Sequence, residues 1–147
     1  FVAKVADPAA PVITVPVPDG WSMQGGSGDI GGYLKGPQGM DSTISIAATA
    51  LEPAKAFDQY ADRLMGESAV SSISVLPAEL CQYSGQKMLG AWSDTPQNAV
   101  EFVDRVVHIW TNAGNYLVSV HTTAPTGTTG FDAAAELLAG DFEILLP

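Results

Sequence analysis

Positive charge is scarce in this sequence. Its 147 residues include 6 Lys and Arg against 16 Asp and Glu, which gives a formal net charge of −10 at pH 7. Nucleic acid and anionic lipid head groups are both recognised through clusters of Lys and Arg that neutralise phosphates. We therefore expect no nucleic-acid partner, and no direct electrostatic contact with an anionic membrane surface.

Cysteine is nearly absent as well. Cys81 is the only one, so the chain has neither an internal disulfide nor a metal site built from several cysteines. No basic residue or histidine lies near Cys81 in the sequence to lower the pKa of its thiol. We interpret Cys81 as a small buried hydrophobic residue rather than a nucleophile. A single cysteine leaves the redox compartment undetermined.

Long hydrophobic runs are missing. No apolar stretch approaches the roughly 20 residues that a membrane-spanning helix needs, and residues 1–10 lack the organisation of a signal peptide. The chain is nevertheless 46% hydrophobic and only 15% charged, so it has a surplus of apolar surface to bury in a core or against an apolar ligand. Its length fits one domain, which we assign to residues 11–147 after an N-terminal tail at residues 1–10.

Alternating and β-branched segments predict mostly strands. The expected strands cover residues 12–17, 30–34, 43–49, 70–75, 79–83, 86–92, 100–110 and 116–122. In the 100–110 segment both alternating faces are apolar, which indicates a strand covered on two sides and therefore central. The residues NAGN at 112–115 have the turn chemistry of a hairpin between the last two strands.

Two helices are expected. Pro53 suits a first helical position and Gly66 suits the end, which predicts a helix over residues 53–65. Its apolar stripe, at helical spacing, consists of Phe57, Tyr60, Ala61, Leu64 and Met65. A second helix is expected over residues 132–139, with a capping box at 129–132. Its inward residues would be Phe131, Leu138 and Phe142. The strands do not alternate with helices, so we predict an α+β fold: a twisted antiparallel sheet of about six strands with helices packed on it.

The glycine-rich residues 26–31 (GSGDIG) match the letters of the dinucleotide-binding fingerprint G-x-G-x-x-G. That fingerprint requires a buried strand before the glycines and a helix after them. Residues 32–37 (GYLKGP) cannot form this helix, since they contain two glycines and a proline. We interpret the segment as a flexible loop between two strands, and we expect no cofactor.

The two histidines leave a chemical alternative open. A two-residue turn at Ala113 and Gly114 would pair His108 with Ser119 and place His121 diagonally on the same sheet face, which also carries Asp104. A metal or acid–base site would require these side chains to converge in a concave site. The alternative, which we favour, is that both histidines are hydrogen-bonded residues of the sheet, with no metal bound.

Other catalytic patterns are weak. No Gly-x-Ser-x-Gly nucleophile elbow occurs. Asp58 and Asp62 lie one helical turn apart on the polar side of the first predicted helix, which is typical of a solvated face rather than of an acid–base pair. We therefore expect no enzymatic activity.

Aromatic and methionine side chains near loops and strand ends are the remaining candidates for function. Flat rings and flexible thioethers suit a surface that binds acyl chains and sugars, although such residues also fill cores. Met23 belongs to this group. The predicted ligand-binding residues are Tyr33, Tyr83, Met88 and Trp92.

Four segments, in this order, resemble the mycobacterial LpqN/LpqT lipoprotein family. They are PVPDGW at 16–21, IGGYLKGP at 30–37, TISIAATALEPAKAF at 43–57 and LGAW at 89–92. The long hairpin and the closing helix follow in the family order, so the resemblance covers nearly the whole chain. The sequence departs from the family at Cys81 and Gln82, where family members typically carry a Gly-Gly turn.

The resemblance implies a Mog1/PsbP-like fold and a lipoprotein without known enzymatic activity. It would be held on the outer face of the plasma membrane by a lipidated cysteine upstream of Phe1, its only attachment to the membrane. It also implies a link with envelope lipids, including trehalose glycolipids, and with the membrane proteins that export them. We expect a monomer that binds an amphiphilic envelope lipid. The alternative is a module that binds an envelope or host protein through an exposed apolar patch.

Overall fold

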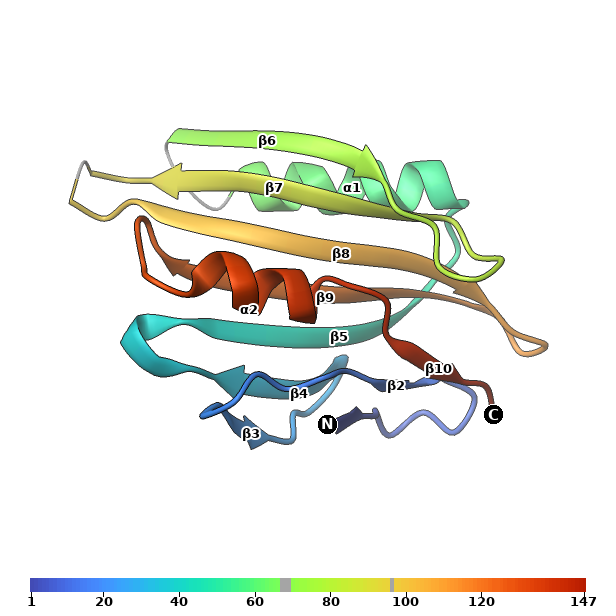
Figure 1. Ribbon diagram of the computed structural model, residues 1–147. Helices are drawn as coiled ribbons and strands as arrows, with labels where there is room; N and C mark the ends of the chain where they lie inside the picture. Colours follow the sequence, from blue (N-terminus) through green and yellow to red (C-terminus); the bar gives the residue numbers. More distant parts are fainter. Residues whose placement is uncertain (67–69, 96) are drawn as a thin grey trace.

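A seven-stranded antiparallel sheet forms the centre of the protein (Figure 1). The computed structural model describes residues 1–66, 70–95 and 97–147. The strands, in spatial order, are β3 (Ser22–Gln24), β4 (Ile30–Lys35), β5 (Asp41–Thr49), β9 (Asn115–Pro125), β8 (Val100–Trp110), β7 (Gly85–Ser93) and β6 (Val70–Pro77). Together with two helices, this sheet confirms the predicted α+β class. No helix in the described ranges is both long and apolar enough to cross a membrane.

The helices cover opposite faces of the sheet (Figure 1). Helix α1 (Pro53–Met65) has the predicted bounds, with Pro53 in its first turn and Gly66 at its C-cap. It packs on β6, β7 and β8, and its Phe57 and Leu64 are buried there. Helix α2 (Phe131–Leu138) packs against β9 from the other side. A short 3-10 helix, η1 (Pro37–Gly39), joins β4 to β5.

Strand β8 lies inside the sheet between β7 and β9, as predicted from its two apolar faces. Successive side chains of a strand point to opposite faces. Phe102 and Val106 accordingly belong to the core under α1, whereas Val103 and Val107 belong to the larger core under α2. Burial of both faces explains the near-continuous apolar sequence of this strand.

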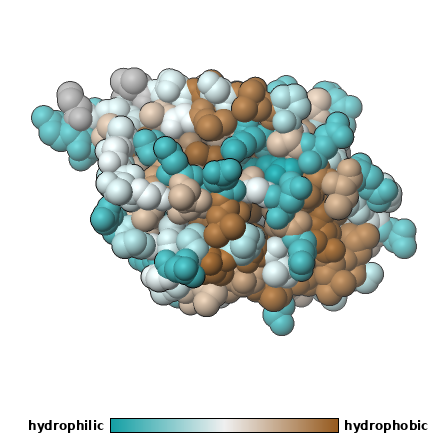
Figure 2. Space-filling view, in the orientation of Figure 1, coloured by the Kyte–Doolittle hydropathy of each residue, from teal (hydrophilic) through white to brown (hydrophobic). Residues whose placement is uncertain are grey.

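A second, three-stranded sheet was not predicted. Its order is β1 (Val2–Ala3), β2 (Val12–Thr14) and β10 (Glu143–Leu145). Residues 1–10, expected to be a tail, are thus part of the domain: Ala3 is fully buried and pairs with Ile13. Strands of two or three residues are too short to show an alternating pattern. Apolar surface gathers on the side of the molecule where this sheet lies, and Val2 and Leu145 are exposed there (Figure 2).

Some local predictions were wrong. Residues 79–83 form a tight turn closed by a bridge between Leu80 and Tyr83, not a strand. Cys81 in this turn is exposed rather than buried. The capping box at 129–132 does not form, because α2 starts after Gly130, which has φ 86° and makes no side-chain cap. Met65, expected on the inner stripe of α1, is 41% exposed.

The turn between β8 and β9 was misplaced by one residue. The backbone nitrogen of Thr111 donates to the carbonyl oxygen of Gly114 at 2.8 Å, so the two turn residues are Asn112 and Ala113. The hydroxyl oxygen of Thr111 accepts hydrogen bonds from the nitrogens of Ala113 and Gly114, at 3.1 and 3.2 Å. A shift of one residue in a hairpin turn changes the pairing of the strands by two residues. This change decides which side chains meet on the α1 face.

Candidate functional site

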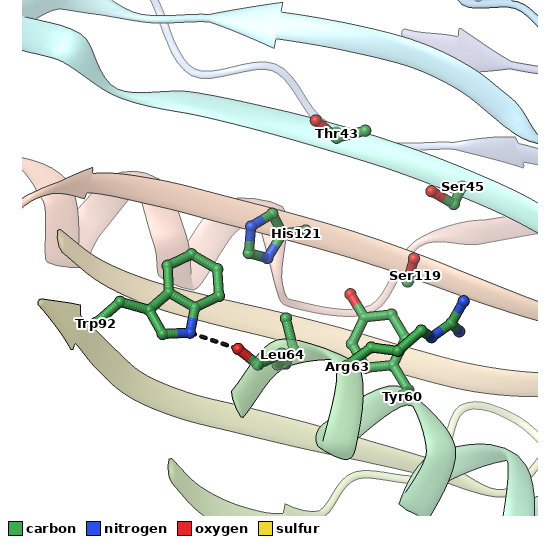
Figure 3. A pocket seen from close by; sticks show the side chains of 8 residues that line it. All are labelled: Thr43, Ser45, Tyr60, Arg63, Leu64, Trp92, Ser119 and His121. Atoms are coloured by element: carbon green, nitrogen blue, oxygen red, sulfur yellow. Dashed lines mark hydrogen bonds between the residues drawn. The ribbon is translucent and has the colours of Figure 1, made fainter. Parts of the chain in front are cut away.

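A cavity of about 420 Å³ opens on the sheet face that α1 covers (Figure 3). It lies between the C-terminal half of α1 and the strands β5, β7 and β9. Eight residues line it: Thr43, Ser45, Tyr60, Arg63, Leu64, Trp92, Ser119 and His121. Six of these carry polar groups on their side chains besides the Trp92 indole, so the cavity combines hydrogen-bonding groups with apolar surface.

Strand pairing builds the floor of this cavity. Thr43 of β5 lies opposite His121 of β9, and Ser45 lies opposite Ser119. Residues two apart on a strand share a face, so these four polar side chains form two adjacent rows that point toward α1. On the other side of β9, His121 lies opposite Asp104 of β8. Thr43, His121 and the buried Asp104 therefore lie side by side across the three neighbouring strands.

Asp104 is fully buried and both of its oxygens accept hydrogen bonds. Nδ1 of His121 lies 2.6 Å from Oδ1, and the hydroxyl of Tyr60 donates to Oδ2 at 2.5 Å. A carboxylate can only accept, so His121 carries a proton on Nδ1. Two short bonds to a charged group offset the cost of burying that charge. Asp104 thereby fixes the orientation of both rings that face the cavity.

Tyr60 is held in its protonated form. Burial raises the pKa of its hydroxyl well above the usual 10, and the negative charge of Asp104 and the hydrogen bond to it act in the same direction. Tyr60 is therefore a hydrogen-bond donor throughout the physiological range. The guanidinium carbon of Arg63 lies 5.9 Å from the centre of the Tyr60 ring. This contact holds an exposed cation at the wall of the cavity.

Trp92 forms the aromatic wall. Its Nε1–H donates to the carbonyl oxygen of Leu64 at 2.6 Å (Figure 3). The last carbonyls of a helix have no partner within the helix, so this bond satisfies one of them and ties α1 to β7. The Trp92 ring centre lies 4.5 Å from that of Phe102 and 5.4 Å from that of His121. Contacts with Leu64, Phe102 and His121 thus hold the indole in place beside the polar floor.

Of the four predicted ligand-binding residues, the structure places Trp92 in the cavity wall. Met88 is fully buried under α1, opposite Asp104. Tyr33 lies on β4 opposite Thr43, 39% exposed and outside the cavity lining. Tyr83 is buried among the residues of the larger core, where its ring packs edge-on against Trp110 with centres 5.4 Å apart. Met23, on the edge strand β3, is 54% exposed.

His108 does not join His121, contrary to the arrangement that a turn at Ala113 and Gly114 predicts. His108 pairs with Leu117 instead of Ser119, four residues along β8 from Asp104, a separation of about 13 Å. Its Nε2 lies 3.0 Å from the carbonyl oxygen of Leu51. Within the described ranges, no three His, Cys, Asp or Glu side chains are grouped so that they could hold a metal ion.

Most of the residues that line the cavity were not predicted as site residues from the sequence. Tyr60 was placed on an apolar stripe, where its hydroxyl was the one signal that a polar partner lies opposite. Thr43 and Ser45 alternate with buried Ile44 and Ile46, a pattern that is typical of a solvated strand face. The sequence could not show that this face meets the end of a helix rather than open solvent.

Comparison with known proteins supports the fold. No protein-family model matches the sequence, and no curated protein matches it either. The structure is similar to LpqN of Mycobacterium tuberculosis, described as involved in cell envelope biogenesis, with a TM-score of 0.75, 20% sequence identity, and coverage of 100% of this chain and 90% of LpqN. The chain has the fold of LpqN. The predicted structural resemblance is therefore confirmed.

The solution structure of PsbP from the cyanobacterium Synechocystis sp. PCC 6803 is also similar. Its TM-score is 0.54 at 10% identity, and the match covers 97% of this chain and 96% of the cyanobacterial one. The Mog1/PsbP-like fold that the resemblance implied is thus confirmed. At such low identities these similarities establish the fold alone. The function has to be inferred from the residues of the site.

Proposed function

We propose that this chain is a cell-envelope binding protein that holds the head group of an amphiphilic lipid in the cavity beside α1. The observation that carries the proposal is the lining itself: one flat aromatic wall, Trp92, beside a floor of hydroxyl and imidazole groups. A hydroxyl-rich head group such as trehalose matches both parts. Its apolar ring faces suit an indole, and its hydroxyls suit Ser, Thr, His and Arg.

The size of the cavity agrees with this ligand. Small-molecule sites in proteins span roughly 300–1,000 Å³, and the volume here is about 420 Å³. Seven of the eight lining residues carry a side-chain group that can exchange hydrogen bonds, which an acyl chain cannot use. We therefore assign recognition to the head group, while the acyl chains add affinity of about 0.8 kcal/mol for each CH₂ that they bury elsewhere on the surface.

Three of the polar residues have distinct roles in this proposal. Tyr60 and His121, oriented by Asp104, present fixed groups to the sugar. Arg63 supplies a charged donor at the rim, beside the Tyr60 ring. In this proposal His121 binds ligand and carries out no chemistry. A ligand site whose polar groups are already fixed loses little conformational entropy on binding.

The cellular setting is part of the proposal. LpqN is described as involved in cell envelope biogenesis. We infer from the shared fold that this chain also acts in the envelope, on the outer face of the plasma membrane, anchored through a lipidated cysteine upstream of Phe1. Membrane proteins that export envelope lipids are then the natural partners for loading or unloading the ligand.

Calorimetric titration with a water-soluble acyl-trehalose tests the proposal. We expect saturable binding that weakens about tenfold or more in Trp92→Ala, because a buried aromatic contact is worth over 1 kcal/mol. Trp110→Phe is the matched control: Trp110 is 51% exposed at the far end of β8, and its replacement should leave binding unchanged. A fatty acid with the same acyl chain should bind more weakly.

Two results would contradict the proposal. One is the absence of heat at millimolar acyl-trehalose. The other is equal affinity for the acyl-trehalose and the fatty acid, which would mean that the cavity does not recognise the sugar head group.

A further inference from the structure

Strand β6 is an unusually open sheet edge. It ends the seven-stranded sheet, and no strand in the described part of the chain pairs with its outer side. The opposite edge, β3, has only three residues, whereas β6 has eight. Natural edge strands are protected by charged residues, proline, bulges or shortness. Residues 70–76 (VSSISVL) contain no charge and no proline, and the pairing of β6 with β7 is regular throughout.

The pairing shows which backbone groups point outward. The nitrogen of Ala78 donates to the carbonyl oxygen of Gly85 at 3.0 Å. Residues bonded to a neighbouring strand alternate in an antiparallel ladder, so Ser72, Ser74 and Leu76 bond to β7. The N–H and C=O groups of Ser71, Ile73 and Val75 therefore face away from the sheet. Pro77 has no N–H and ends this row of donors.

A second cavity lies beside this row. Its volume is about 460 Å³, and it lies between the first turns of α1 and the end of β6. Pro53 and Phe57 of α1 line it, together with Val75 and Pro77 of β6. Val75 is 45% exposed. A strand added along β6 would have alternate side chains on this face, so one of them would enter the cavity.

Charge indicates the partner. Glu79 is the charged residue in the wall of this cavity, and the chain as a whole carries −10. A second copy of this chain also carries a net charge of −10, and the repulsion between the two chains opposes pairing of β6 with itself. A segment with basic residues is attracted instead.

We propose that the β6 edge binds an extended, basic segment of a partner protein, which adds to the sheet as its eighth strand. Main-chain hydrogen bonds to Ser71, Ile73 and Val75 supply the affinity, and an apolar side chain in the cavity beside Phe57 supplies the specificity. The cavity beside Phe57 lies at the opposite end of α1 from Tyr60, Arg63 and Leu64, whereas the Ser71 end of the edge pairs with Trp92 of the proposed lipid site.

A ten-residue random peptide library displayed on phage provides the probe. Selection on the immobilised full chain should enrich peptides with alternating apolar residues and an excess of Lys and Arg. The enriched peptide, made synthetically, should bind the wild type and lose about tenfold or more in affinity for Val75→Pro. Proline at an outward-facing edge position is tolerated by the fold, yet it removes one donor and obstructs an added strand. Val75→Thr keeps the N–H and the β-branch and adds only a hydroxyl, so it should bind the peptide much more tightly than Val75→Pro.

Amide hydrogen exchange gives a second measurement that does not depend on the folding of a variant. In the wild type, bound peptide should slow exchange at Ser71, Ile73 and Val75 and leave Ser72 and Ser74 unchanged. No enrichment, equal binding to Val75→Pro and Val75→Thr, or protection elsewhere would overturn the proposal. Concentration-dependent dimerisation that Val75→Pro abolishes would also overturn it, in favour of a second copy at this edge.

Discussion

Asp104 and His121 meet across neighbouring strands, with Oδ1 of the first 2.6 Å from Nδ1 of the second. The other oxygen of Asp104 bonds to Tyr60, 44 residues away in the sequence. A helix and two strands are therefore joined through one buried carboxylate. Because Asp104 has no exposed surface, its two bonds contribute both to stability and to the geometry of the cavity.

The first prediction concerns this carboxylate. Asp104→Asn keeps the side-chain shape but places an NH₂ group against one of two donors, Tyr60 or His121. We expect it to lower the free energy of unfolding by about 1–3 kcal/mol, the cost of an unsatisfied buried polar group. Tyr60→Phe should cost a similar amount. Urea unfolding of both single variants and the double variant measures the effect.

The double variant decides whether the two residues act together. If they do, its loss of stability should be smaller than the sum of the single losses by about 1 kcal/mol. Tyr33→Phe is the control, because Tyr33 is 39% exposed and its change should stay within about 0.5 kcal/mol. Strict additivity of Asp104→Asn and Tyr60→Phe would refute the coupling.

The second prediction concerns alkaline pH. The folded protein raises the pKa of Tyr60 well above 10, through burial and the neighbouring Asp104. An unfolded tyrosine ionises near pH 10. The stabilising contribution of the protonated hydroxyl is thus fully present below pH 10 and is lost as the pH rises through the folded pKa.

The test is to measure the free energy of unfolding of the wild type and of Tyr60→Phe by chemical denaturation between about pH 8 and pH 11. The stability advantage of the wild type over the variant should be constant up to about pH 10 and shrink above it. Other tyrosines titrate equally in both proteins and cancel in the difference. An advantage that stays the same at pH 11 would show that Tyr60 does not titrate as proposed.

Local signals account for the parts of the fold that could be predicted. Pro53 at the start of α1, its apolar stripe and Gly66 at its end are all neighbours in sequence, and the helix has the predicted bounds. The two-sided apolar pattern of β8 likewise reports burial directly. Strands β1 and β10 carry no such signal, since their two or three residues are held by pairing with β2.

The site depended on information that no local pattern carries. Asn112 with Ala113, or Ala113 with Gly114, are both acceptable turn pairs, and the hydroxyl of Thr111 selects the first by binding two turn nitrogens. That choice places His121 opposite Asp104. The approach of Tyr60 then depends on where α1 packs on the sheet, which is a property of the whole fold.

The third prediction concerns Arg105, which is buried on the α2 side of β8. Its guanidinium donates to the carbonyl oxygens of Ala78, Glu79 and Ala139 and to the carboxylate of Asp141. These bonds join the turn after β6 to the end of α2. Most of its partners are backbone carbonyls, so its contribution to stability comes from the several donors of the guanidinium rather than from the ion pair.

Arg105→Lys and Asp141→Asn separate these two contributions. Lysine keeps the charge but cannot reach acceptors in several directions, so Arg105→Lys should lower the free energy of unfolding by about 2–3 kcal/mol. The side chain of Asp141 is 77% exposed, and Asp141→Asn should cost less than about 1 kcal/mol. Equal losses in the two variants would show that the ion pair dominates.

The last prediction concerns Cys81. It occupies the first position of the two-residue turn between Leu80 and Tyr83, with φ at 55°. Side chains disfavour this left-handed conformation by about 1 kcal/mol, whereas glycine adopts it freely. Cys81→Gly should therefore leave the midpoint of thermal unfolding unchanged or raise it by a few degrees, since the greater freedom of glycine in the unfolded chain offsets part of the gain. Cys81→Val should lower the midpoint, because a β-branched residue fits this conformation poorly. A lower midpoint for Cys81→Gly than for Cys81→Val would show that the left-handed backbone at this position does not limit stability.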